Sequence, residues 1–343
     1  MVWLLKQIVR VAVLAGLAAA IYGATLVQMP RPGLGPRTGP AISDARVWGY
    51  QLQNAVPDRI ASAIDVLVID SQRSREPHTT LSPADVRRFK TRPDGRERVV
   101  LAYLSVGEAE SYRYYWRSFW SLLRPSWLGA ENTEWRGNYK VRFWQAGWQK
   151  ILLDSRRSLF DVLFELVSDE RKAYIDRILD AGFDGIYLDR VDIYEEWAKE
   201  RRSAEADMIA FVGAISTYAK ARKPGFLVVP QNAEELLQHA HYRRQIDAVG
   251  KEDLYFGISH SEDENAAKDT AASVAYLNRA RADKLPVMVV EYLTSADKRA
   301  RAEARAREQG FLLHFATRQL NQPPEPPGLP LQPPAPAAAR PKG

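Results

Sequence analysis

The stretch AGFDGIYLDRVD, residues 181–192, indicates how this chain folds. It follows a helical pattern, turns at Gly182, continues as the apolar run Ile186–Leu188 and reaches the carboxylate of Asp189 where that run ends. In a barrel of parallel strands, the side chains at the C-terminal ends of the strands face the active site. The pattern therefore makes Asp189 the first candidate for a catalytic residue.

Seven further apolar runs predict strands on either side of this stretch. They are Val47–Tyr50, Val66–Ile69, Val99–Leu104, Phe226–Val229, Ile246–Val249, Val287–Val290 and Phe311–Leu313, of which Val47–Tyr50 and Ile246–Val249 are the weaker candidates. Near-continuous hydrophobicity is typical of parallel strands that are covered on both faces.

Segments with helical periodicity separate several of these runs. They are residues 170–181, 195–221, 233–244, 263–282 and 296–309, and several of them end in Gly or Pro directly before the next strand. Strands and helices that alternate eight times in about 280 residues predict an α/β fold, a (β/α)8 or TIM barrel. A doubly wound open sheet is the alternative.

The interval between the third and fourth strands is too long for a single crossover. Residues 106–169 contain six of the nine tryptophans, so we expect an enlarged, Trp-rich loop excursion at this point. These aromatic residues are interpreted either as the core of the excursion or as a stacking wall for sugar rings, with one or two of them lining the cleft.

The two ends of the chain differ in composition from the middle. Lys6 and Arg10 precede an apolar stretch, Val11–Val27, which is typical of an export signal and close in length to a membrane span. We expect residues 1–40 to be a signal peptide, or a membrane anchor through residues 11–29, followed by a Pro/Gly linker. The catalytic domain is expected at 41–321 and a disordered Pro/Ala-rich tail at 322–343. The protein is therefore expected to be periplasmic or extracellular.

The charge and the cysteine content exclude several classes of function. Of the net charge of +6, residues 1–40 carry +4, residues 322–343 carry +1, and the middle carries only +1. Such a middle does not favour binding to nucleic acid. The absence of cysteine excludes disulfides and thiolate nucleophiles. We predict neither a metal nor another cofactor, and the sequence leaves the oligomeric state open.

Polar residues at or directly after the predicted strand ends form the candidate site. They are Gln51, Asp70, Glu108, Asp189, Asp192, Gln231, Asn232, Glu252, Glu291 and His314, with Tyr187 inside the fourth strand. Two carboxylates that flank a bond are the minimum for glycoside hydrolysis. We therefore predict that Asp189 and Glu252 are catalytic and that the other residues bind the sugar.

Some of these residues have alternative roles that the sequence leaves open. Asp192 is also suited to cap the following helix. Glu252 is alternatively part of a solvated turn, Asp70 an ion-pair partner of Arg73, and His314 a packed side chain. The same acids together with His314 are also conceivable as metal ligands, which we regard as the weaker interpretation.

Four segments, residues 99–110, 181–194, 230–235 and 250–253, resemble glycoside hydrolase family 114. The resemblance covers about residues 47–320 and is strongest to the bacterial extracellular branch of the endo-α-1,4-polygalactosaminidases. It implies a TIM-barrel hydrolase of α-1,4-linked galactosamine polymers in which Asp189 and Glu252 are the catalytic pair. A cleft lined by acids also suits a cationic amino sugar.

The sequence departs from the fungal members of this group beside both catalytic positions. Arg190 replaces an Asn directly after Asp189, and Lys251-Glu252-Asp253 replaces an Asn-Glu-Gln type motif. Arg190 partly offsets the negative charge of the predicted cleft. The prediction is an exported glycosidase of a galactosamine-containing polysaccharide. The alternatives are a hydrolase of another glycan and a non-catalytic polysaccharide-binding protein on the same barrel.

Overall fold

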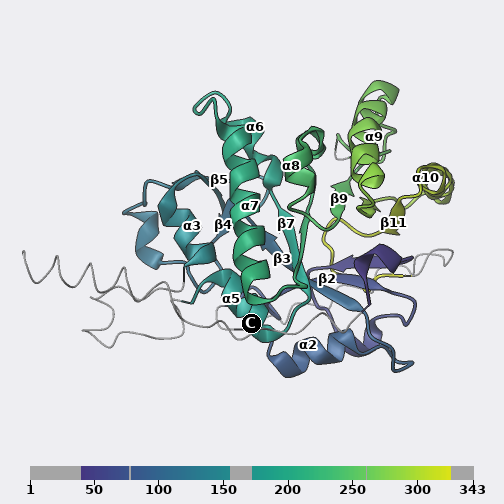
Figure 1. Cartoon of the computed structure of the whole chain (residues 1–343), viewed down its shortest axis with the longest axis horizontal. Helices are drawn as coiled ribbons and strands as arrows, with labels where there is room; N and C mark the ends of the chain where they lie inside the picture. The colour runs from purple at the N-terminus through teal and green to yellow at the C-terminus, as the bar shows by residue number, and fades with distance from the viewer. Residues whose placement is uncertain (1–39, 77–78, 155–171, 260, 326–343) are drawn as a thin grey trace, which may run out of the picture. The chain divides into compact units, whose positions relative to one another are not determined.

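The computed structural model describes residues 40–76, 79–154, 172–259 and 261–325. Parallel strands form its centre (Figure 1). There are eight of them, and seven largely coincide with apolar runs of the sequence, whereas the sixth begins only at Val249, the last residue of the run Ile246–Val249. The strands are β1 (Trp48–Gln51), β2 (Val66–Asp70), β3 (Val99–Ser105), β7 (Gly185–Asp189), β8 (Leu227–Pro230), β9 (Val249–Glu252), β10 (Val287–Glu291) and β11 (Leu312–Phe315).

The order of the strands in space follows their order in the chain. Ladders join β1-β2-β3-β7-β8 and β9-β10-β11. A parallel bridge between Gln231 and Gly250 links β8 to β9. Between β11 and β1, the Trp48 indole N–H donates to the Leu312 carbonyl at 3.0 Å. A doubly wound sheet would reverse its strand order at a switch point, so this order confirms the predicted (β/α)8 fold.

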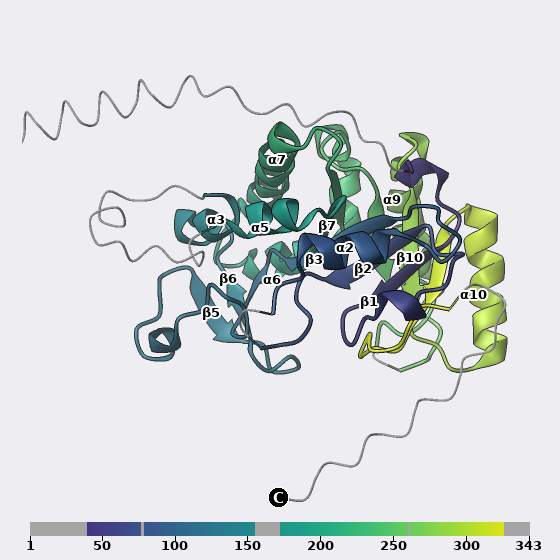
Figure 2. The same ribbon diagram turned by 90° about the horizontal axis from the view of Figure 1, so that it is seen from below.

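Helices that lie between successive strands cover the outside of the barrel. They include α2 (Pro83–Lys90), α5 (Tyr174–Ala181), α7 (Ala204–Arg222), α9 (Ala267–Ala282) and α10 (Ala296–Gln309). Figure 2 shows α9 and α10 outside the strands, beside β10 and β11. The connection from β1 to β2 departs from the expected alternation, because it contains only the 3-10 turn Pro57–Arg59.

Two of the predicted helices are interrupted. The segment 195–221 divides into α6 (Tyr194–Trp197) and α7, because Asp207 in the first turn of α7 accepts hydrogen bonds from Ser203 and Arg201. The segment 233–244 forms a 3-10 turn (Glu234–Gln238) and the short α8 (Ala240–Arg243). An extended residue, His239, separates these two elements.

The predicted excursion after β3 is a small antiparallel sheet followed by a helix. Its strands are β4 (Glu108–Glu110), β5 (Leu128–Glu131) and β6 (Asn138–Val141), paired in the order β4-β6-β5, and the helix is α3 (Ala146–Leu153). The 3-10 turn Ser118–Ser121 lies between β4 and β5. Trp127 and Trp148 are buried and pack with ring centroids 5.3 Å apart, so part of the tryptophan set is core.

The residues of each strand alternate between two buried clusters. Val66 and Val68 of β2 belong to the cluster inside the barrel, whereas Leu67 and Ile69 pack against the outer helices. This two-residue period decides which strand-end side chains reach the mouth of the barrel.

The predictions for the ends of the chain concern residues outside the described part. Residues 1–39 and 326–343 are not described, so the signal peptide or anchor and the disordered tail stay predictions. Within the described ranges, no helix combines the length and the apolar character that a membrane crossing requires.

Candidate active site

A cavity of about 740 Å³ opens at the C-terminal ends of the barrel strands. Seven residues predicted from the strand ends line it: Asp70, Glu108, Asp189, Asp192, Gln231, Asn232 and Glu252. They meet there because parallel strands of one barrel end at the same face.

The predicted catalytic carboxylates are held together by one amide group. Gln231 Nε2 donates to Asp189 Oδ1 at 3.0 Å and to Glu252 Oε2 at 2.7 Å. The two oxygens are therefore no more than 5.7 Å apart, the sum of these lengths. With the two N–H bonds of an amide about 120° apart, their separation is about 5 Å.

Each carboxylate also accepts a hydrogen bond from a tyrosine. Tyr103 donates to Asp189 Oδ2 at 2.6 Å, and Tyr292 donates to Glu252 Oε1. Asn232 forms two further hydrogen bonds with Glu252. Its side-chain amide group donates to Glu252 Oε2 at 3.3 Å, and its side-chain oxygen accepts from the Glu252 backbone N–H at 3.1 Å. Neither carboxylate forms a salt bridge within the described part of the chain.

Burial and the neighbouring Asp189 charge raise the pKa of Glu252 well above its usual range. Removing an ionised carboxylate from water is unfavourable, and a second negative charge nearby adds to the cost. Glu252 therefore retains its proton at pH values where an exposed glutamate has lost it. Glu252 is therefore suited to the role of proton donor, which two-carboxylate hydrolysis assigns to one member of the pair.

Sharp turns follow directly after three of these positions. Arg190, Asn232 and Asp253 have φ values of 59°, 59° and 50°, in the left-handed region that residues other than glycine rarely adopt. Such strained backbone is concentrated at functional sites. Here it turns the chain away from the barrel directly after Asp189, Gln231 and Glu252.

Four residues that the sequence assigned to substrate binding do not line the cavity: Gln51, Tyr187, Glu291 and His314. Gln51 and Glu291 follow interior residues of their strands, Tyr50 and Val290, and so lie on the outward face. Glu291 is completely buried, accepts the Tyr255 backbone N–H at 2.8 Å, and has its pKa raised by burial to about 8.

Tyr187 and His314 lie on the inward face, but in a layer below the cavity. Tyr187 packs on Tyr50 with centroids 5.2 Å apart. Gly250 leaves room for this ring, because a Cβ at that position would lie 2.0 Å from the Tyr187 hydroxyl. His314 packs edge-on against Trp48, and burial lowers its pKa to about 3. Both side chains therefore fill the barrel beneath the catalytic pair.

The flanking acids are paired with arginines, although not as the sequence suggested. Asp70 contacts the buried Arg113, whereas Arg73 pairs with Asp85. Arg190 contacts Glu108 at 3.1 Å, Asp192 at 3.7 Å, and Glu196. It therefore reduces the acidity of the cleft, as expected.

Asp192 does not cap the helix that follows it. Its carboxylate makes no capping hydrogen bond to the 3-10 turn Val191–Ile193 or to α6. Its Oδ1 atom is buried and has no hydrogen-bond partner among the described residues. Burial raises the pKa of Asp192 to about 6. An unsatisfied acceptor at the cavity wall is suited to a donor group of a ligand.

The match to a sequence family identifies the chain. Residues 35–325 match glycoside-hydrolase family GH114. The chain belongs to this family. Its relatives include an uncharacterised Deinococcus radiodurans protein, 32% identical over 88% of this chain and 91% of its own length. A Thermotoga maritima protein is 36% identical over 68% of this chain and 67% of its own.

Two solved structures share the GH114 fold of this chain. Ega3 of Aspergillus fumigatus, determined in complex with galactosamine, superposes with a TM-score of 0.58 at 19% identity over 85% of this chain and 99% of its own. The glycoside hydrolase domain of PelA from Pseudomonas aeruginosa gives 0.58 at 18% identity over 82% of this chain and 98% of its own.

Several residues that line this GH114 cavity were not selected individually from the sequence, among them Tyr103, Trp135 and Tyr292. Tyr292 directly follows the end of β10, so the same strand-end criterion identifies it. Tyr103 lies two residues before the end of β3, on the inward face that Leu101 shares. Trp135, 48% exposed on the loop between β5 and β6, lines the cavity. Of the six tryptophans in the excursion, it is the one that meets the prediction of an aromatic residue in the cleft.

The described residues suggest no metal centre in this GH114 barrel. No group of three or more His, Asp or Glu side chains in the described ranges is arranged to hold an ion. His314, which was considered as a ligand together with the acids, is separated from them. It lies below the cavity and packs against Trp48.

Proposed function

We propose that this protein is a retaining endo-glycosidase that cleaves a polysaccharide containing α-1,4-linked galactosamine. The observation that carries the mechanism is the Gln231 amide that joins Asp189 to Glu252. A separation of about 5 Å corresponds to retaining enzymes, whose second carboxylate attacks the sugar directly, whereas inverting enzymes need about 6.5–9.5 Å to admit water.

The two steps follow from the protonation of the pair. Asp189 attacks the anomeric carbon while protonated Glu252 gives its proton to the departing glycosidic oxygen, so one C–O bond forms as the other breaks. Glu252, now ionised, then removes a proton from a water molecule that attacks the glycosyl–Asp189 ester. The product keeps its α configuration, and both side chains return to their initial states.

The substrate class rests on the family and on the amino-sugar chemistry of the cavity. The galactosamine complex of Ega3 supports a hexosamine substrate for this chain. Asp192, with an unsatisfied oxygen beside Asp189, offers an acceptor to an amino or hydroxyl group. A separated or salt-bridged carboxylate pair would favour the rival interpretation, a binding protein without activity. The contacts of Asp189 and Glu252 argue against it.

The proposal is tested by incubating the full chain with a panel of polysaccharides. The panel contains α-1,4-linked galactosamine and N-acetylgalactosamine polymers, with chitosan and amylose as controls. We expect oligosaccharides of several lengths from the galactosamine polymers only, detected by mass spectrometry, with the α anomer formed first in proton NMR. Initial β product would contradict retention, and cleavage of a control glycan alone would contradict the substrate class.

The pH dependence of the reaction follows from the raised pKa of Glu252. Because the general acid must be protonated, we expect kcat/KM on the polymer to fall as the pH rises through this pKa, well above the value of about 4.3 for an ordinary glutamate. A glycosyl fluoride needs little protonation of its leaving group and is the matched substrate. Its kcat/KM should lack this alkaline decline. An identical decline for both substrates would assign the titration to another group.

A further inference from the structure

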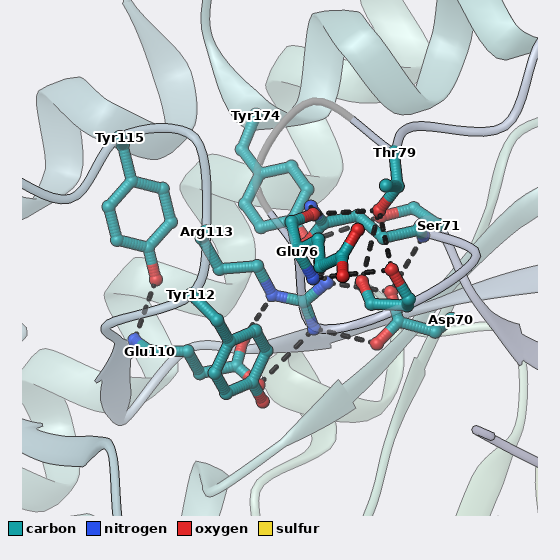
Figure 3. Close-up of polar contacts among 11 residues, drawn as sticks. Asp70, Ser71, Glu76, Thr79, Glu110, Tyr112, Arg113, Tyr115 and Tyr174 are labelled. Carbon is teal, nitrogen blue, oxygen red and sulfur yellow. Dashed lines mark hydrogen bonds and ion pairs between the residues drawn. The ribbon is translucent and has the colours of Figure 1, made fainter. Parts of the chain in front are cut away.

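One buried arginine joins the small sheet of the excursion to the mouth of the barrel. Arg113, which follows β4, donates two hydrogen bonds to Asp70 at the end of β2, at 2.6 and 3.0 Å (Figure 3). It donates two more to Glu110 of β4, at 2.6 and 3.2 Å. Bidentate bonds from a buried guanidinium to carboxylates are strong and fix the geometry of the groups that they join. The sheet β4-β6-β5 therefore has a defined position beside the cavity.

The turn that joins β5 to β6 is fixed by hydrogen bonds of its own. Glu108 of β4 accepts from the side chains of Asn132, at 2.8 Å, and Asn138, at 3.1 Å. The side-chain oxygen of Asn132 in turn accepts from the backbone N–H groups of Glu134 and Trp135, at 2.9 and 3.3 Å. The backbone of these two residues is therefore ordered without a ligand, which lowers the entropy cost of binding one there.

Trp135 presents an indole ring to the cavity from this turn. It lines the cavity and is 48% exposed. The other tryptophans of the excursion each pack against a further aromatic ring, and they are Trp116, Trp120, Trp127, Trp144 and Trp148. Trp135 has no such ring contact among the residues that the structure describes. An indole that is open to the cavity and carried by an ordered turn is suited to stack on the apolar C–H face of a sugar ring.

Glu134, the neighbour of Trp135, supplies a negative charge without a partner. It is exposed and lines the cavity, and its side chain forms neither an ion pair nor a hydrogen bond within the described ranges. The carboxylate is thus available to the ammonium group of a hexosamine. The indole beside it also attracts a cation through its π face. The two side chains therefore suit both parts of an amino sugar, the apolar face of the ring and the charged substituent.

We propose that Trp135 and Glu134 form a subsite for one amino-sugar ring, separate from the catalytic pair. Both lie on the excursion, whereas Asp189 and Glu252 end strands of the barrel, and neither hydrogen-bonds to that pair in the described part of the chain. The cavity of about 740 Å³ is large enough for a ligand of more than one ring. A ring held on Trp135 anchors the polymer while another ring is cleaved. The inference rests on the proposed function, because it concerns the polymer that the same cavity cleaves.

The test measures Kd by isothermal titration calorimetry on the full chain carrying Asp189→Asn, so that the ligand is not cleaved. The ligands are an α-1,4-linked galactosamine oligosaccharide and its N-acetylated counterpart of the same length. We expect Trp135→Ala to raise Kd for both ligands about tenfold, because stacking does not require the charge. Trp135→Phe keeps an aromatic face and should recover most of this affinity. The control Phe119→Ala removes a similarly exposed ring that does not line the cavity, and it should change Kd less than about twofold.

Glu134→Gln separates the charge from the stacking. It should raise Kd about threefold for the galactosamine oligosaccharide only, and this loss should shrink at high NaCl because an exposed ion pair is screened. Equal effects of Trp135→Ala and Phe119→Ala would overturn the subsite, as would equal effects of Glu134→Gln on both ligands or an absence of binding. A parent chain that binds with this pattern but cleaves no polymer would refute the proposed function alone, since Kd does not depend on turnover.

Discussion

Asp189→Asn is expected to lower kcat on the polymer by about 10⁴-fold or more, the largest effect of any single substitution in this chain. An amide is a far weaker nucleophile than a carboxylate, so the glycosyl ester cannot form. The shape of the site is kept, because the Asn oxygen still accepts from Gln231, and the Tyr103 hydroxyl can rotate to accept from the new amide group. Reducing-end release over time measures the loss.

Asp192→Asn is the matched control, since it makes the same chemical change three residues away on the same cavity wall. We expect it to cost less than about 100-fold, because Asp192 is assigned to substrate contact and not to bond formation. Thermal unfolding should show similar Tm values for the parent and both variants. Asp189→Asn activity within tenfold of the parent would remove Asp189 from the mechanism.

Glu252→Ala should have the second largest effect, a loss of about 10²–10⁴-fold on the polymer, because both proton transfers disappear. An α-galactosaminyl fluoride should still react with Asp189, since fluoride departs with little protonation. The glycosyl–enzyme would then accumulate, because no base activates water. Added azide needs no base, so it should restore turnover and yield an α-glycosyl azide, identified by NMR.

The isosteric Glu252→Gln variant separates proton transfer from packing. It can keep hydrogen bonds to Gln231 and Tyr292 but cannot exchange a proton, so it should be as inactive on the polymer as the alanine variant. A β-glycosyl azide, or the absence of an accumulated intermediate by intact-protein mass spectrometry, would contradict the covalent route through Asp189.

The sequence identified the strands more reliably than the helices. A fully buried parallel strand requires apolar residues in nearly every position, and seven of the eight predicted runs became strands over most of their length. The eighth, Ile246–Val249, shares only Val249 with β9 (Val249–Glu252). Helical periodicity is a weaker constraint on continuity. The segment 195–221 had the pattern of one helix. Hydrogen bonds from Arg201 and Ser203 to Asp207 nevertheless accompany an interruption that the periodicity does not reveal.

The site was only partly predictable from the sequence. The strand-end criterion identifies the edge of the barrel but not the face to which a side chain points. Glu291 and Glu252 both end strands, but Glu252 shares the inward face with Gly250, whereas Glu291 shares the outward face with Val289. A shift of one residue along a strand therefore separates a catalytic candidate from a buried structural carboxylate.

By itself, the sequence determined the fold class and the edge of the barrel at which the cavity lies, because these depend on local hydrophobicity and on where apolar runs stop. It also predicted Asp189 and Glu252 as the catalytic pair. The tertiary structure decided the rest. Gln231 joins Asp189 to Glu252, Tyr103 and Tyr292 donate to these two carboxylates, and Arg113 forms an ion pair with Asp70. Each of these contacts connects residues far apart in the chain. Such contacts depend on the tertiary arrangement of the parallel strands, which brings separate strand ends to one face.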